Sequence, residues 1–179
     1  SIIDAQAAVA AEAERHSLPR QALRTTLICI VQKDRMVGYA HIGDGGGALG
    51  AGLDDCQEFL VPQKAHGRSN VLRAALGPDM IGGPRAGSLE MTFDRQMIIA
   101  GSDGVFDLYE PCDVLESVGR CIRDTDQDPH TVTTGFIHAL AAQTDEKGEL
   151  LASDNITLGV MMPTNRIPVE AITSQGASQ

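Results

Sequence analysis

Two aspartates stand at the ends of apolar runs that have the pattern of β-strands. Asp103 comes just after the run 97–100, and Asp154 comes just before the alternating run 155–162. If these runs are neighbouring antiparallel strands, the end of one and the start of the other lie at the same edge of a sheet. The pattern therefore predicts that the two carboxylates approach each other, although Asp-Gly and Asp-Asn are also common in ordinary turns.

A third aspartate, Asp44, follows the apolar run 36–42 and is expected at the same edge. No Lys or Arg stands beside any of the three in the sequence, and converging carboxylates repel one another unless a cation compensates them. Carboxylate oxygens without His or Cys favour Mg²⁺ or Mn²⁺ over zinc. We therefore predict a magnesium or manganese site formed by Asp44, Asp103 and Asp154.

Two pairs of antiparallel strands are expected, each joined by a short polar turn. The first pair covers 25–32 and 36–42, and the continuous β-branched run 25–32 indicates a strand buried on both faces. The second pair covers 89–93 and 97–100. A further strand is expected over 155–162, where apolar and polar residues alternate. Most of the sheet is therefore expected to be antiparallel.

Helices are expected outside this sheet. The alanine-rich segment 1–16 is typical of a helix, and two more begin near Pro111 and Pro129, where apolar residues recur at helical spacing. The segment 63–88 has little periodicity and is expected to be irregular, with a short helix over 71–76. These elements predict the α+β class, with helices segregated from an antiparallel sheet.

The composition excludes two classes of partner. The 179 residues include 14 Lys plus Arg against 24 Asp plus Glu, a net charge of −10. That charge argues against a surface for nucleic acid or an anionic membrane, because both are polyanions. No apolar run approaches the ~20 residues that a membrane span needs. We interpret the scattered cysteines as reduced thiols of a cytoplasmic protein. They are Cys29, Cys56, Cys112 and Cys121.

Four blocks of the sequence resemble, in the same order, motifs of the metal-dependent serine/threonine protein phosphatases of the type 2C (PPM) family. The block 25–44, from Thr-Thr-Leu to Gly-Asp, resembles the family's Thr-Thr strand, hairpin and Gly-Asp-Ser motif. The block 97–107 resembles its apolar strand with Ser-Asp-Gly, and 69–77 resembles the segment before that strand. Ser-Asp-Asn-Ile-Thr at 153–157 resembles its closing strand.

The resemblance implies a helix-flanked antiparallel β-sandwich with αββα layers. By the same resemblance, Asp103 and Asp154 match aspartates of the family's metal centre, and Asp44 matches the acidic residue of a further, weaker metal site. The implied activity is hydrolysis of phosphoserine and phosphothreonine in a phosphoprotein substrate. Water activated by Mg²⁺ or Mn²⁺, with two or three ions in the complete domain, would attack phosphorus without a covalent intermediate.

The chain departs from the family pattern before its Thr-Thr strand. Family members carry there an Arg for phosphate and an Asp-Gly-x-Gly-Gly motif whose aspartate bridges two metals, but no Asp-Gly precedes Thr25. Gly45 also stands where the family has Ser. We therefore expect 1–162 to be the C-terminal three-quarters of a phosphatase 2C-like domain, followed by a polar tail at 163–179. Absent strands predict exposed sheet edges and association through them.

Three other interpretations compete with this one. Cys29 and Arg35 have the spacing of a cysteine-phosphatase signature, but the strand pattern between them favours an inert buried thiol. The glycines at 43–47 lack the Gly-Lys-Ser/Thr of a nucleotide-binding loop. The remaining alternative is a catalytically inactive phosphatase-like module that binds a phosphoprotein or regulates a partner. Such a module would keep Asp103 and Asp154 while lacking the bridging aspartate.

Overall fold

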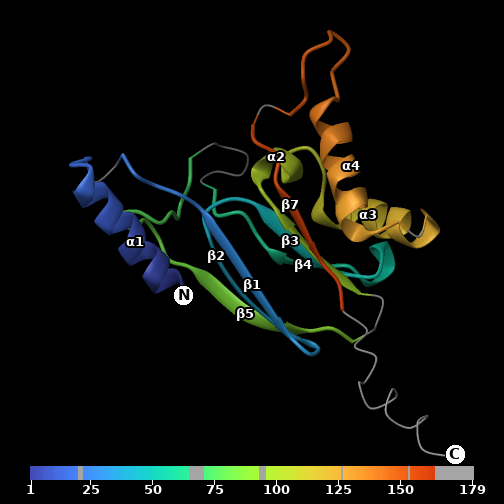
Figure 1. Cartoon of the computed structure of the whole chain (residues 1–179), viewed down its shortest axis with the longest axis horizontal. Coiled ribbons are helices and arrows are strands. Elements are labelled where there is room, and N and C mark those ends of the chain that lie inside the picture. Colours follow the sequence, from blue (N-terminus) through green and yellow to red (C-terminus); the bar gives the residue numbers. More distant parts are fainter. Residues whose placement is uncertain (20–21, 65–70, 93–95, 126, 153, 164–179) are drawn as a thin grey trace, which may run out of the picture.

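The computed structural model describes residues 1–19, 22–64, 71–92, 96–125, 127–152 and 154–163. Two antiparallel sheets pack face to face, with helices on the outside (Figure 1). The helices are α1 (Ile2–Arg15), α2 (Asp103–Phe106), α3 (Pro111–Thr125) and α4 (Pro129–Ala141), with a 3-10 turn η1 (Leu53–Asp55). The strands are β1 (Leu27–Lys33), β2 (Met36–Ile42), β3 (Gly46–Gly50), β4 (Gln57–Leu60), β5 (Arg85–Glu90), β6 (Met97–Gly101) and β7 (Leu158–Met161). The predicted fold class, an α+β antiparallel sandwich flanked by helices, is confirmed.

The strands divide into two sheets in the orders β1-β2-β5 and β4-β3-β6-β7. The predicted first hairpin is confirmed, with Lys33 opposite Met36 next to the turn. The predicted pairing of 89–93 with 97–100 is wrong, because β5 pairs with β2 whereas β6 pairs with β3 and β7. Apolar periodicity indicates a strand but does not identify the strand with which it pairs. The runs 89–93 and 97–100 are neighbours in the sequence, but they belong to different sheets.

Successive apolar side chains of β6 point in opposite directions and pack into two cores. Ile98 faces the three-stranded sheet, whereas Met97 and Ile99 face α3 and α4. The core between the sheets contains Val37, Leu49, Phe59, Leu60, Met91 and Ile98. The core beneath the helices contains Ala48, Met97, Ile99, Val105, Val114, Leu115, Val118, Val132, Leu140 and Leu158. Because both faces of β6 are buried, packing fixes the position of the strand end that precedes Asp103.

The predicted helices over 1–16, from Pro111 and from Pro129 are confirmed as α1, α3 and α4. Ser1 caps α1 through a capping box with Asp4. α3 and α4 cover the four-stranded sheet, whereas α1 lies on the side of the three-stranded sheet (Figure 1). Among the described helices, none is both long enough and apolar enough to cross a membrane.

No helix forms over 71–76, so that prediction is wrong. Leu72 forms an isolated antiparallel bridge with Lys64. Leu76 forms another with Thr25, and its side chain is almost fully buried. The extended backbone here gains hydrogen bonds to neighbouring segments and buries apolar side chains, and these tertiary contacts outweigh the helix propensity of Leu and Ala.

β1 is covered on one face only. Ile28 and Ile30 pack toward the core between the sheets, whereas Cys29 is exposed and Val31 is 63% exposed. The prediction of a strand buried on both faces is therefore wrong, and Cys29 is not a core thiol. Because Cys29 lies within a regular strand and Arg35 lies beyond its end, the two do not frame a phosphate-binding loop.

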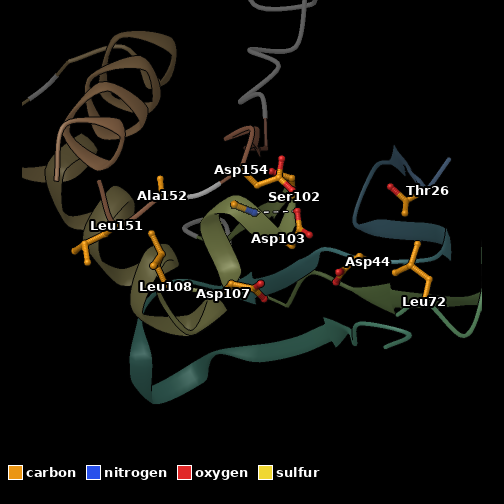
Figure 2. A pocket seen from close by; sticks show the side chains of 11 residues that line it. Thr26, Asp44, Leu72, Ser102, Asp103, Asp107, Leu108, Leu151, Ala152 and Asp154 are labelled. Carbon is orange, nitrogen blue, oxygen red and sulfur yellow. Dashed lines mark hydrogen bonds between the residues drawn. The ribbon is translucent and has the colours of Figure 1, made fainter. Parts of the chain in front are cut away.

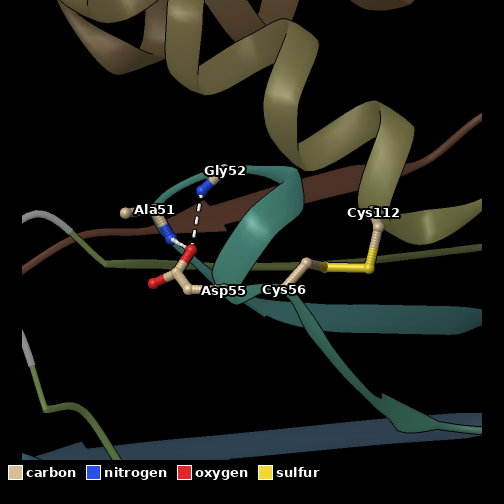
Figure 3. Close-up of a disulfide and its surroundings, with 5 residues drawn as sticks. All are labelled: Ala51, Gly52, Asp55, Cys56 and Cys112. Atoms are coloured by element: carbon tan, nitrogen blue, oxygen red, sulfur yellow. Dashed lines mark hydrogen bonds between the residues drawn. A yellow bond between two sulfur atoms is a disulfide. The ribbon is translucent and has the colours of Figure 1, made fainter.

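A disulfide joins Cys56, at the start of β4, to Cys112, in the first turn of α3 (Figure 3). Cys29 and Cys121 are free. The interpretation of all four cysteines as reduced thiols is therefore wrong for this pair, because the chain folds back over a sequence separation of 56 to bring them together. The cysteines consequently no longer support a cytoplasmic location, since disulfides persist mainly in oxidising compartments.

Asp55, next to this disulfide, organises the turn that leads into β4. Its Oδ1 accepts hydrogen bonds from the backbone N–H groups of Ala51, at 2.7 Å, and Gly52, at 3.0 Å (Figure 3). Its Oδ2 accepts a bond from the side chain of Gln96 at 3.1 Å. Burial alone would raise the pKa of Asp55, but these donors favour the carboxylate and hold the pKa below its usual value.

We expect Asp55→Ala to lower the free energy of unfolding by about 2 kcal/mol at pH 7, because several donors lose a charged acceptor. A lowered pKa in the folded state stabilises the fold above the unfolded pKa, and that contribution is lost as pH falls through the folded pKa. The difference between variant and parent should therefore shrink in urea titrations at pH 3. Asp54→Asn, at an exposed neighbouring position, is the control and should change little.

Candidate metal centre

Asp44, Asp103 and Asp154 line one cavity of about 520 Å³ at an edge of the four-stranded sheet. Figure 2 shows their side chains around this space together with that of Asp107. The full lining consists of Thr26, Asp44, Leu72, Ser102, Asp103, Gly104, Asp107, Leu108, Leu151, Ala152 and Asp154. The structure therefore brings together all three aspartates that the sequence singles out.

The strand register explains this convergence. β6 and β7 are antiparallel, with Gly101 at the end of β6 opposite Leu158 at the start of β7. Asp103 and Asp154 therefore flank neighbouring strand ends. Asp44 reaches the same edge by another route than expected, because it precedes β3, whose first residue Gly46 also pairs with Gly101. The crossing from β2 in one sheet to β3 in the other places Asp44 between the sheets.

Ser102 ties together the two loops that carry Asp103 and Asp154. Its hydroxyl donates to the Asn155 carbonyl at 2.9 Å and accepts from the Thr157 backbone N–H at 3.0 Å. Its own backbone N–H donates to the Thr157 carbonyl at 3.0 Å. These bonds continue the β6–β7 pairing past the strand ends, so the separation of the two aspartates is fixed by the sheet.

Glycines on both sides shape the loop at Asp44. Gly43 and Gly45 have φ angles of +99° and +102°, which residues with a Cβ rarely adopt. The structure thus gives a reason for Gly45 at the position where the phosphatase motif has Ser. The Gly43–Gly47 segment turns into strand β3, beginning at Gly46, rather than into a helix that could hold a nucleotide phosphate.

Each of the three aspartates uses Oδ1 to accept the backbone N–H of the next residue. The distances are 2.8 Å for Asp44, 3.0 Å for Asp103 and 2.6 Å for Asp154. The Oδ2 atoms differ. Asp44 Oδ2 forms an ion pair with the ammonium of Lys64 at 3.0 Å. No hydrogen bond from the described residues reaches Oδ2 of Asp103 or Asp154, so these two atoms are available to a ligand.

The pKa of Asp103 is raised above its usual value, first by burial and then by the negative charges of Asp44 and Asp154. A raised pKa means that the carboxylate form is destabilised where it stands. A divalent cation between Asp103 and Asp154 would relieve both causes, and carboxylate oxygens are the donors that Mg²⁺ and Mn²⁺ prefer. In their donor chemistry, the residues present therefore fit such an ion.

Lys64 and Asp107 are parts of the site that sequence reasoning missed. The Lys64 ammonium lies 2.7 Å from Asp107 Oδ1 and 3.0 Å from Asp44 Oδ2, and the lysine side chain is only 6% exposed. The expectation that no Lys or Arg stands beside the aspartates is therefore wrong for Asp44, because the fold brings Lys64 into contact with it. The sequence could have indicated Asp107, because it lies one helical turn after Asp103. It gave no indication of Lys64, because Lys64 belongs to a segment without periodicity.

The described side chains do not complete the coordination shell of a metal ion. Within the described part of the chain, no three His, Cys, Asp or Glu side chains are grouped closely enough to hold a metal ion by themselves. Asp103 and Asp154 supply two carboxylates, and hard cations commonly complete their shell with water or substrate oxygens. The site thus resembles an open metal centre in which the protein supplies only some of the ligands.

A family model described as protein phosphatase 2C matches residues 2–141 of the 179. The chain belongs to the protein phosphatase 2C family. The resemblance seen in the sequence motifs is thereby confirmed. No curated protein matches the chain.

Solved phosphatase structures share the fold of this protein phosphatase 2C chain. A bacterial serine phosphatase is 14% identical with a TM-score of 0.65, and the match covers 88% of this chain and 65% of that one. PstP/Ppp of Mycobacterium tuberculosis is 17% identical, with a TM-score of 0.61 and coverages of 88% and 67%. The catalytic domain of PstP in complex with two manganese ions is 20% identical, with a TM-score of 0.62 and coverages of 87% and 64%. This chain spans about two thirds of their length.

Proposed function

We propose that this protein phosphatase 2C chain forms the metal-binding part of a serine/threonine phosphatase that hydrolyses phosphoserine and phosphothreonine. One observation carries the proposal: Asp103 and Asp154 face the same cavity, each with an oxygen that no described residue engages. Both stand in motifs that resemble those of the family to which the chain belongs.

Asp103 and Asp154 would hold Mg²⁺ or Mn²⁺ through their Oδ2 atoms. A divalent ion held there lowers the pKa of a bound water and neutralises charge on a phosphoryl group. Ser102 keeps the two carboxylates at a fixed separation, and the cavity of about 520 Å³ has room for a phosphorylated side chain. Asp44 was expected to hold a further, weaker ion, but its Oδ2 is paired with the Lys64 ammonium.

The proposed substrate is a phosphoprotein, and the proposed domain covers 1–162 with a polar tail at 163–179. A cytoplasmic location remains a prediction from the sequence. Association through exposed sheet edges also remains a prediction, and the edge strand β1 with its exposed Val31 is where we expect it.

The test is hydrolysis of para-nitrophenyl phosphate and of a phosphoserine peptide by the 179-residue chain. We expect turnover that requires Mn²⁺ or Mg²⁺ and stops with EDTA. Metal-independent turnover would contradict the mechanism. A folded chain without turnover in either metal would contradict the phosphatase proposal and leave the inactive binding module as the better account.

A further inference from the structure

The strongest unexplained feature of the site is a buried lysine between two aspartates. Lys64 Nζ contacts both Oδ atoms of Asp107, at 2.7 and 3.0 Å, and Asp44 Oδ2 at 3.0 Å. The exposed fractions of the Lys64 and Asp44 side chains are only 6% and 10%. Asp44 and Asp107 line this cavity, and Lys64 and Asp107 line a neighbouring cavity of about 480 Å³.

The backbone holds Lys64 in this position. The preceding residue, Gln63, donates its backbone N–H to the Gly43 carbonyl at 2.8 Å, and its side-chain Oε1 accepts the Gly43 N–H at 2.8 Å. The Gln63 amide also donates to the Gly83 carbonyl at 2.9 Å. Gln63, which precedes Lys64, is therefore hydrogen-bonded to Gly43, which precedes Asp44, independently of the ion pair. The ammonium is consequently pre-positioned at Asp44.

A metal ion at Asp44 would have to displace this ammonium or lie beside it. Two cations a few ångströms apart repel strongly where water is scarce. Displacement would also break both ion pairs of a buried lysine, leaving its charge unpaired. Asp44 and Asp107 both form ion pairs with the Lys64 ammonium. Asp103 and Asp154 form no ion pair with a described residue, although the positive charge of Lys64 also favours the Asp103 carboxylate from a greater distance.

We propose that the Lys64 ammonium takes the place of the metal ion expected at Asp44. Asp44 and Asp107 then form a metal-free part of the centre, and this chain binds one ion fewer than it would if Asp44 also held a metal ion. The inference uses the proposed metal site at Asp103 and Asp154 only as the reference for counting ions. It does not depend on phosphatase activity.

The test combines thermal unfolding with Mn²⁺ titration calorimetry on Lys64→Met, Asp44→Asn and the double variant. In EDTA, Lys64→Met should lower Tm by about 5–10 °C, because two carboxylates lose their counter-ion. Mn²⁺ should remove most of this deficit and should bind with one additional site relative to the parent. The double variant should lose that extra Mn²⁺ site. Lys147→Met, at an exposed lysine, is the matched control and should behave like the parent.

Asp44→Asn alone decides the question if Lys64→Met does not fold. With Lys64 present, the proposal predicts an unchanged number of bound Mn²⁺ ions in Asp44→Asn. Loss of one ion in this variant would overturn the proposal, and so would a folded Lys64→Met that gains no site. Failure of the phosphatase proposal has a different signature, namely absence of turnover with these ion counts unaltered.

Discussion

Asp103→Asn should reduce metal-dependent hydrolysis by this chain about 100–1000-fold. The carboxylate is one of two that face the cavity with an unengaged oxygen, and an amide is a poor ligand for a hard cation. A metal contribution of several kcal/mol to transition-state stabilisation corresponds to that factor in rate. The measurement is kcat/KM for para-nitrophenyl phosphate at saturating Mn²⁺.

The fold should survive this substitution. Burial and two neighbouring negative charges raise the pKa of Asp103, so its carboxylate is destabilised in the folded protein. Removing the charge should leave the Tm in EDTA equal to that of the parent or higher, as is common for functional residues. Asp54→Asn removes a charge at an exposed position and should keep full activity. Near-normal turnover in Asp103→Asn would exclude Asp103 as a metal ligand.

Loss of the Cys56–Cys112 disulfide should be the largest single change in stability. The bond closes a loop of 56 residues, for which the chain-entropy relation gives about 4 kcal/mol. The Cys56→Ser/Cys112→Ser variant should therefore unfold about 10 °C below the parent. The disulfide joins the start of β4 to α3, and α3 packs on β3 and β6. The sheet edge that carries the candidate metal site therefore depends on the disulfide indirectly.

The two free cysteines provide the matched control for the disulfide. Cys29→Ser and Cys121→Ser, both at exposed positions, should leave the Tm nearly unchanged. Reductant should lower the Tm of the parent and of these controls, but not that of the double serine variant. A parent protein whose Tm is insensitive to reductant, and equal to that of the double variant, would show that the bond does not contribute.

The sequence predicted those parts of the fold that local pattern determines. Apolar runs located β2 and β6, apolar alternation located β7, and helical spacing located α3 and α4. The sequence did not reveal which strands pair with one another, as the separation of β5 and β6 into different sheets shows. The helix expected over 71–76 failed for a related reason, because its backbone hydrogen bonds go to Thr25 and to other distant segments.

In the candidate site, too, local pattern predicted some residues, whereas others depend on tertiary structure. Asp103 and Asp154 were recognisable because each stands beside a strand end, and neighbouring antiparallel strands bring such ends together. Lys64 was not, because an irregular segment without periodicity carries it to Asp44. The pairing of Cys56 with Cys112 likewise depends on tertiary structure, since spacing alone does not reveal which cysteines meet.

Calorimetric titration of Mn²⁺ into the metal-free chain tests the central claim most directly, because it reports on Asp103 and Asp154 without requiring turnover. We expect the parent and Asp54→Asn to bind Mn²⁺ with the same affinity. Asp103→Asn and Asp154→Asn should each weaken binding by at least about 10–100-fold. Unchanged Mn²⁺ affinity in both of these variants, or no Mn²⁺ binding by the folded parent, would contradict the assignment of this cavity as the metal centre.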